Sequence, residues 1–113
     1  MASLTLRGEG RVGEIAALLV REVPRCGMSC ELVEEIRRSL GNDSVYVLVF
    51  EKYYMRASNR VTLTVVVSQD GPDVVVDAVS AGGGQGAVFK YDWGAEDEFA
   101  AEVEQVLKGS RFK

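Results

Sequence analysis

Between residues 45 and 93, apolar and polar side chains alternate with a period of two, and this alternation constrains the fold more than any other feature. A period of two is the spacing of a β-strand, because successive side chains of a strand point to opposite faces of a sheet. Three turn signals divide the stretch: Ala57-Ser58-Asn59, Gln69-Asp70-Gly71-Pro72 and Gly82-Gly83-Gly84. The sequence therefore predicts four consecutive antiparallel strands joined as a meander over residues 45–93.

Helical spacing flanks the predicted meander on both sides. Apolar residues recur at intervals of three and four over 12–23, which predicts a first helix. Ser29 can cap a second helix, whose apolar stripe spans 32–40. A third helix is expected after Gly94, with these apolar residues facing the core: Phe99, Val103, Val106 and Leu107.

These elements, with a short first strand over Ser3–Arg7, predict an α+β fold. We expect a single antiparallel sheet of four or five strands, with two N-terminal helices and one C-terminal helix packed on one face. The order of elements is similar to helix-grip folds, in which a curved sheet wraps a long C-terminal helix around a cavity. A chain of 113 residues is expected to form one domain, residues 1–113.

The charge and the amino terminus limit the partners that we expect. Lys and Arg number 13 against 17 Asp and Glu, a net charge of −4, which argues against nucleic acid and anionic membranes as partners. The longest apolar run of the first half, Ile15–Val20, is too short to span a membrane. The first ten residues also lack the apolar core of a signal peptide, so we expect a cytoplasmic protein.

The chain contains two cysteines, Cys26 and Cys30, and no histidine. Their spacing is not that of a redox pair, and a zinc site would lack its usual remaining ligands. We therefore expect reduced, structural thiols and predict neither a metal site nor a cofactor.

Glu51 and Lys52 interrupt a strand that is otherwise apolar or aromatic on both faces. If Arg56 and Arg60 flank the following turn, Glu51 lies opposite Val65 and faces the core. A core carboxylate needs a partner, and desolvation would raise its pKa, which makes Glu51 the first functional candidate. Two structural alternatives are a bulge that turns the carboxylate outward and an arginine from a helix that satisfies it.

The other side of the same strand carries Lys52, Tyr54 and Arg56. These three side chains could bind an anion or a planar ligand through charge-assisted hydrogen bonds and cation–π contacts. The alternative is an ordinary solvated face, on which long charged side chains keep their head groups in water.

The glycine run over 82–86 and Trp93 offer further candidates. Stacked glycines can approach a phosphate, but no Lys-Ser or Lys-Thr follows, and the next segment is typical of a strand rather than a helix. A flexible turn is the better interpretation, although Gln85 could line a pocket rim. Trp93 can stack on a ligand or staple the last helix to the sheet.

The same register predicts an exposed apolar patch, because three side chains face away from the side that 61–67 mark as core: Tyr46, Leu48 and Phe50. Such patches commonly mark contact surfaces, and two-fold pairing is the usual way to cover one. We therefore expect a homodimer that a Phe50→Glu change would dissociate. The alternative is that the first strand or the second helix covers the patch.

Three segments resemble a family of small uncharacterised prokaryotic single-domain proteins: VFEKYYMR, GGGQG and DWGAE. The likeness is clearest after Cys30. That family carries no assigned activity, so the resemblance implies no catalytic residues and only suggests that the three segments belong to one feature.

The sequence favours a non-enzymatic binding or self-associating module over two alternatives. One is a small-ligand carrier with a cavity between the sheet and the C-terminal helix. The other is a hydrolase or lyase that uses Glu51 as general acid or base, with Lys52 or Arg56 holding an anionic substrate. No motif sets up a nucleophile beside a base, so we assign no catalytic residue.

Overall fold

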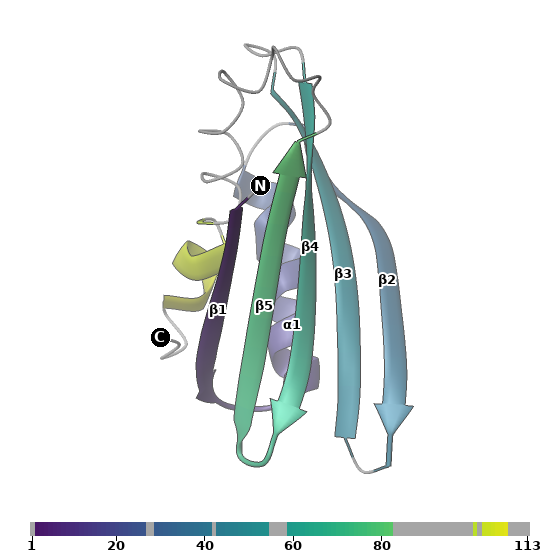
Figure 1. The fold of residues 1–113 in the computed structure, drawn as a ribbon, viewed down its shortest axis with the longest axis vertical. Coiled ribbons are helices and arrows are strands. Elements are labelled where there is room, and N and C mark those ends of the chain that lie inside the picture. The colour runs from purple at the N-terminus through teal and green to yellow at the C-terminus, as the bar shows by residue number, and fades with distance from the viewer. Residues whose placement is uncertain are drawn as a thin grey trace.

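The computed structural model describes residues 2–26, 29–41, 43–54, 59–82, 101 and 103–108. In chain order the elements are β1 (Ala2–Glu9), α1 (Val12–Glu22), the short 3₁₀ helix η1 (Val23–Cys26), β2 (Cys30–Leu40), β3 (Asp43–Tyr54), β4 (Asn59–Asp70) and β5 (Asp73–Gly82). Residues 101 and 103–108 are helical as well. Figure 1 looks onto the sheet, with α1 behind the strands.

The sheet is antiparallel and has the strand order β1-β5-β4-β3-β2. Strands β2 to β5 follow one another as a meander, and β1 joins the meander beside β5. Among the described strands, β1 and β2 therefore form the two edges of the sheet. Because α1 comes between these two edge strands in the chain, it carries the polypeptide from one side of the sheet to the other across one face (Figure 1).

One face of the sheet packs against α1 and forms the core. The predicted first helix is confirmed, and its apolar stripe contributes these buried residues: Val12, Ile15, Ala16 and Leu19. Val103 and Leu107 of the C-terminal helical segment are fully buried in the same cluster. We call the opposite side the open face; its central side chains are Val47, Val49 and Val66, and no described helix covers it.

The predicted second helix is wrong, because residues 30–40 form strand β2. Leu32, Ile36 and Leu40 are spaced by four, which is typical of one face of a helix, but in the strand Leu32 lies opposite Phe50 on the core face and Ile36 opposite Val47 on the open face. Pairing with β3 supplies the backbone hydrogen bonds and decides between the two. Val33 adds a β-bulge between Leu32 and Glu34, which further obscures the alternation of a strand.

The predicted register of the β3–β4 hairpin is also wrong, because Glu51 lies opposite Thr62 rather than Val65. The difference is an odd number of residues, so the two faces of β3 are exchanged. The side chains that we expected on an exposed patch are on the core face: Tyr46, Leu48 and Phe50. Leu48 and Phe50 are fully buried, so this register removes more apolar surface from water.

Other expectations about the elements are confirmed or lie outside the described residues. The first strand is confirmed as β1, which pairs with β5. The fourth strand of the meander, expected over 87–91, and the inward-facing Phe99 are not among the described residues. The sheet is thus the predicted single antiparallel sheet, with fewer helices on it than the sequence indicated.

Ser80 introduces a polar group into the core. Its side chain is buried opposite Leu63, and its hydroxyl has no hydrogen-bond partner within the described part of the chain. An unsatisfied buried polar group costs about 1–3 kcal/mol.

We therefore expect Ser80→Ala to raise the free energy of unfolding by about 0.5–2 kcal/mol, as measured by urea denaturation. Ser68→Ala on the open face is the matched control and should change this free energy by less than about 0.5 kcal/mol. A loss of stability in Ser80→Ala would show that the hydroxyl makes a hydrogen bond.

Candidate functional site

Of the sequence-predicted site residues, the structure describes the side chains of Glu51 and Lys52. Glu51 and Lys52 are neighbours on β3 and point to opposite faces, Glu51 to the open face and Lys52 to the helix-covered face. Tyr54 ends β3, and its side chain is not described. The remaining candidates lie outside the described residues: Arg56, Gln85 and Trp93. Lys52, the one described side chain of the Lys52–Tyr54–Arg56 row, therefore lies on the opposite face from Glu51.

Glu51 is ion-paired on the open face. Its Oε1 accepts a hydrogen bond from Nη1 of Arg60 at 2.7 Å, and the two side chains are 27% and 70% exposed. Together with Glu31 and Tyr53 these residues line a shallow recess of about 310 Å³. An arginine partner was one of the two structural alternatives, but this arginine comes from β4 rather than from a helix, and the carboxylate is not in the core.

Cys30, at the start of β2, also borders this recess. Its Sγ donates to the Val23 carbonyl oxygen at 3.6 Å. The side chain of Cys26 is not described. Among the described residues, no group of three or more His, Cys, Asp or Glu is arranged to hold a metal ion.

The side chain of Gln69 joins two loops at one end of the sheet. Its Oε1 accepts from the backbone N–H of Val12 at 2.9 Å. Its Nε2 donates to the carbonyl oxygens of Gly10, Gly71 and Asp73 at 3.0, 3.1 and 2.9 Å. One amide therefore caps the start of α1, whose own N-cap residue makes no side-chain cap, and closes the β4–β5 turn.

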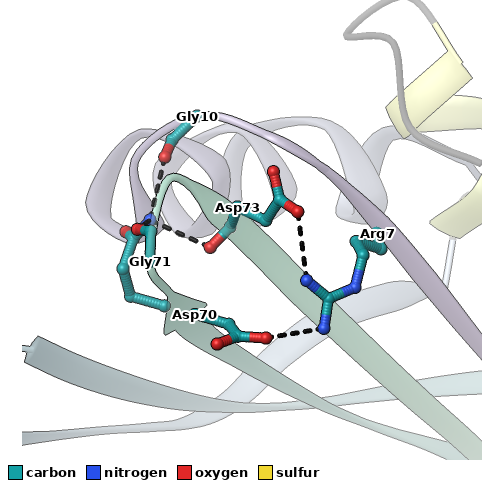
Figure 2. A network of polar contacts seen from close by, with 6 residues as sticks. Arg7, Gly10, Asp70, Gly71 and Asp73 are labelled. Carbon is teal, nitrogen blue, oxygen red and sulfur yellow. Dashed lines mark hydrogen bonds and ion pairs between the residues drawn. The ribbon is translucent and has the colours of Figure 1, made fainter.

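Arg7 clamps the same turn from β1, as Figure 2 shows. Its guanidinium donates to Asp70 at 2.6 Å and to Asp73 at 3.0 Å. These hydrogen bonds, that to Asp70 above all, raise the pKa of Arg7. The stabilisation that corresponds to a raised arginine pKa is fully present at any pH below the unfolded-state pKa. It is lost only as the pH rises through the folded-state pKa, so the contribution of Arg7 is constant across the neutral range.

A wider recess of about 840 Å³ lies at this end of the sheet. The first turn of α1 and two sheet turns form its walls, which carry both signs of charge: Glu9, Arg11, Glu14 and Asp43. The small-ligand carrier that the sequence left as an alternative would have its cavity elsewhere, between the sheet and the C-terminal helix. Sequence reasoning missed this recess because it is assembled from loops far apart in the chain.

Strand β2 is the most exposed element of the sheet. Helix α1 packs chiefly on β3 and β4, and β2 contacts β3 and η1. From Glu31 to Ser39 every side chain except Leu32 is exposed, including Val33 at 54% and Ile36 at 38%. An edge strand also presents a row of backbone N–H and C=O groups that can pair with another strand.

Local side chains occupy two of these backbone groups. The N–H of Glu35 donates to Oε1 of Glu34 at 3.2 Å, and Nη1 of Arg38 donates to the C=O of Arg37 at 3.1 Å. The order of charges along this segment, Glu-Glu-Ile-Arg-Arg, was visible in the sequence. We missed its meaning because the segment was interpreted as a helix.

The fold and these surfaces define a small α+β protein whose single antiparallel sheet is covered by helices on one face and open on the other. The chain belongs to a family of unknown function (DUF6054), whose model matches residues 1–111. The expected resemblance to an uncharacterised family is thereby confirmed. A search of curated proteins found no match to the chain. No helix within the described ranges is long and apolar enough to cross a membrane.

Proposed function

We propose that the protein is a non-enzymatic module that works by associating with a second copy of itself as a homodimer. The observation that carries this proposal is strand β2, an ordered strand of 11 residues at the sheet edge with exposed side chains on both faces. A strand in this position buries little apolar surface and leaves its outer backbone groups to solvent. A second strand paired with β2 would form hydrogen bonds with these backbone groups and would shield the exposed side chains from water.

The surroundings of β2 support association. Ile36 lies opposite Val47 on the open face, and Val47 lies opposite Val66, so apolar side chains run from the edge strand into the middle of the sheet. An apolar stripe that reaches an exposed edge gains from a partner that extends the sheet, because the partner removes the edge side chains from water.

The hydrolase or lyase alternative has less support. It depends on Glu51, whose carboxylate is held by Arg60 on the open face rather than set in an apolar pocket. An acid or base whose pKa is tuned for catalysis normally depends on desolvation or on a like charge nearby. An exposed ion pair with Arg60 favours a structural role.

We also propose that residues 1–113 form one domain and that the protein is cytoplasmic. A single core cluster that draws on α1, the sheet and the C-terminal helical segment supports the first proposal. The cysteine usage supports the second, because the chain has only two cysteines and their spacing is not that of a redox pair.

The oligomeric state tests the proposed function. Sedimentation equilibrium from micromolar to millimolar concentration should give a mass close to twice 12.3 kDa, with dissociation on dilution. A mass of 12.3 kDa throughout this range would contradict the proposal.

A further inference from the structure

We infer that two copies join through their β2 strands, antiparallel and about a two-fold axis at Ile36, so that the two sheets become one continuous sheet; this interface rests on the proposed self-association. The inference starts from the faces of β2. Through their partners on β3, Glu35 and Arg37 lie on the helix-covered face, and Glu34, Ile36 and Arg38 lie on the open face.

The symmetry of such a dimer restricts its register. A two-fold axis perpendicular to the sheet turns one copy within the plane of the sheet and leaves its faces unchanged. Residues directly opposite each other in an antiparallel pair share a face, so a residue of the open face can meet only a residue of the open face. One residue must then lie opposite its own symmetry mate, and the central choices are Glu35, Ile36 and Arg37.

The charges distinguish these three registers. Centring on Glu35 or on Arg37 places two like charges directly opposite each other, which is destabilising. Centring on Ile36 places Glu34 opposite the partner's Arg38 and Glu35 opposite the partner's Arg37. The symmetry repeats both pairs, so every charge of the segment 34–38 meets an opposite charge. Of the three registers, only the one centred on Ile36 places every charged residue of the segment opposite a residue of opposite charge.

The backbone of β2 is also oriented for pairing with a second strand; it fits all three centres, so the charges decide among them. The N–H of Glu35 and the C=O of Arg37 bond to the side chains of Glu34 and Arg38, at 3.2 and 3.1 Å, which indicates that they point away from β3. Within a strand, residues two apart direct their N–H and C=O groups to the same side. Residues 35 and 37 therefore present their backbone to an incoming strand. In the register centred on Ile36 these two residues are opposite each other and form hydrogen-bonded pairs.

The side chains of Glu34 and Arg38, which bond to the edge backbone in a single copy, pair with each other across the dimer interface. In a single copy, Glu34 accepts from the N–H of Glu35, and Arg38 donates to the C=O of Arg37. On association that N–H meets the C=O of the partner's Arg37. Glu34 and the partner's Arg38 are then released and lie opposite each other. Each of these four groups exchanges one partner for another, so none is left unsatisfied.

Charges on an edge strand often serve to prevent pairing, and that role is the competing explanation. Any arrangement of charge would serve it. Self-pairing instead requires both acids on one side of the centre and both bases on the other, with an apolar residue at the axis. The segment 34–38 has this order, and Ile36 at its centre is 38% exposed. The bulge at Val33 lies outside the segment, where pairing with β3 is regular.

Charge exchange tests the interface through three variants of the full chain. Glu34→Arg with Glu35→Arg gives a segment with arginine on both sides of Ile36, and Arg37→Glu with Arg38→Glu gives one with glutamate on both sides. We expect each double variant to dissociate, with the dissociation constant raised about a hundredfold, because every cross-strand pair becomes repulsive. An equimolar mixture of the two should form a heterodimer. The quadruple variant, which exchanges both blocks and keeps the net charge, should dimerise like the natural chain.

Cross-linking locates the axis. In the Ile36→Cys variant the two introduced thiols lie opposite each other in a non-hydrogen-bonded pair, with Cα atoms about 4.5 Å apart. Oxidised glutathione should therefore give a disulfide-linked dimer. Glu34→Cys is the matched control, because its two thiols are about 14 Å apart along the strands and should not link. Both variants keep the natural cysteines.

The outcomes separate the interface from the proposed function. The β2 interface is supported if the mixture of the two double variants forms a heterodimer and if Ile36→Cys, but not Glu34→Cys, gives a disulfide-linked dimer. A natural chain that dimerises while both double variants dimerise equally well overturns this interface and leaves self-association in place. A natural chain that is monomeric throughout overturns both. Circular dichroism of each variant checks that the fold is kept, which we expect because residues 33–39 are exposed.

Discussion

Phe50→Glu is expected to prevent folding, whereas Val49→Glu, one position away, should leave the protein folded. Phe50 is fully buried on the core face, and a carboxylate there would lose its hydration without gaining a partner. The lost packing alone costs about 3–5 kcal/mol, a large part of the 5–15 kcal/mol that stabilises a typical domain. Val49 lies on the open face opposite Thr64, where a carboxylate can reach water. Circular dichroism and urea denaturation measure both outcomes.

Phe50→Leu serves as the conservative control for the same position. It should fold and lose about 1–3 kcal/mol, because it keeps an apolar side chain and leaves a small cavity. If Phe50→Glu were instead folded and merely monomeric, the patch of Tyr46, Leu48 and Phe50 would be exposed, and the β3–β4 register of the structure would be wrong.

Gln69→Ala is expected to lower the free energy of unfolding by about 2–4 kcal/mol, although it removes no apolar contact from the core. The change abolishes the hydrogen bond from Val12 and those from the two N–H groups of Nε2, which three carbonyl oxygens share; a full hydrogen bond is worth about 1 kcal/mol. It also leaves the first N–H of α1 without its cap. Urea denaturation measures the loss, and Gln105→Ala on the exposed side of the C-terminal helical segment is the matched control.

Gln69→Glu adds a pH readout to this prediction. A carboxylate keeps the acceptor for Val12 but faces three carbonyl oxygens, so its folded-state pKa is raised. A raised pKa favours the protonated form in the folded state, and the variant should gain stability as the pH falls through the range in which glutamate is protonated. Equal stability of both Gln69 variants and the natural chain at every pH would contradict the role of the amide.

The strands β1, β3, β4 and β5 and the helix α1 could be predicted because their apolar periods are long and local. The register between β3 and β4 could not be predicted from the sequence. It depends on where the turn ends, and the structure pairs Tyr54 with Asn59, whereas the sequence suggested Arg56 with Arg60. The two pairings differ by three residues in register. Because three is an odd number, every side chain of β3 changes to the opposite face of the sheet.

The candidate surfaces were harder to foresee than the core. Gln69 and Val12 are 57 positions apart, and nothing in the local sequence of either indicates the contact. Strand β2 was mispredicted for a different reason, because its apolar residues recur every four positions as on a helix, and the bulge at Val33 breaks the alternation of the strand. Its charge order carried the useful signal, but that signal has meaning only once the segment is known to be an edge strand.

The position of β1 has a consequence for how the chain acquires its structure. Its hydrogen-bonding neighbour in the sheet is β5, and Thr5 meets Asp77 across 72 positions of sequence. On the ribosome the first strand therefore emerges long before the strand that it pairs with. Closing such a long loop slows folding, so we expect refolding on the millisecond-to-second scale of proteins dominated by non-local pairings. Until β5 has been synthesised, α1 and β1 have no complete sheet to pack on. The sheet can therefore be completed only after most of the chain has been synthesised.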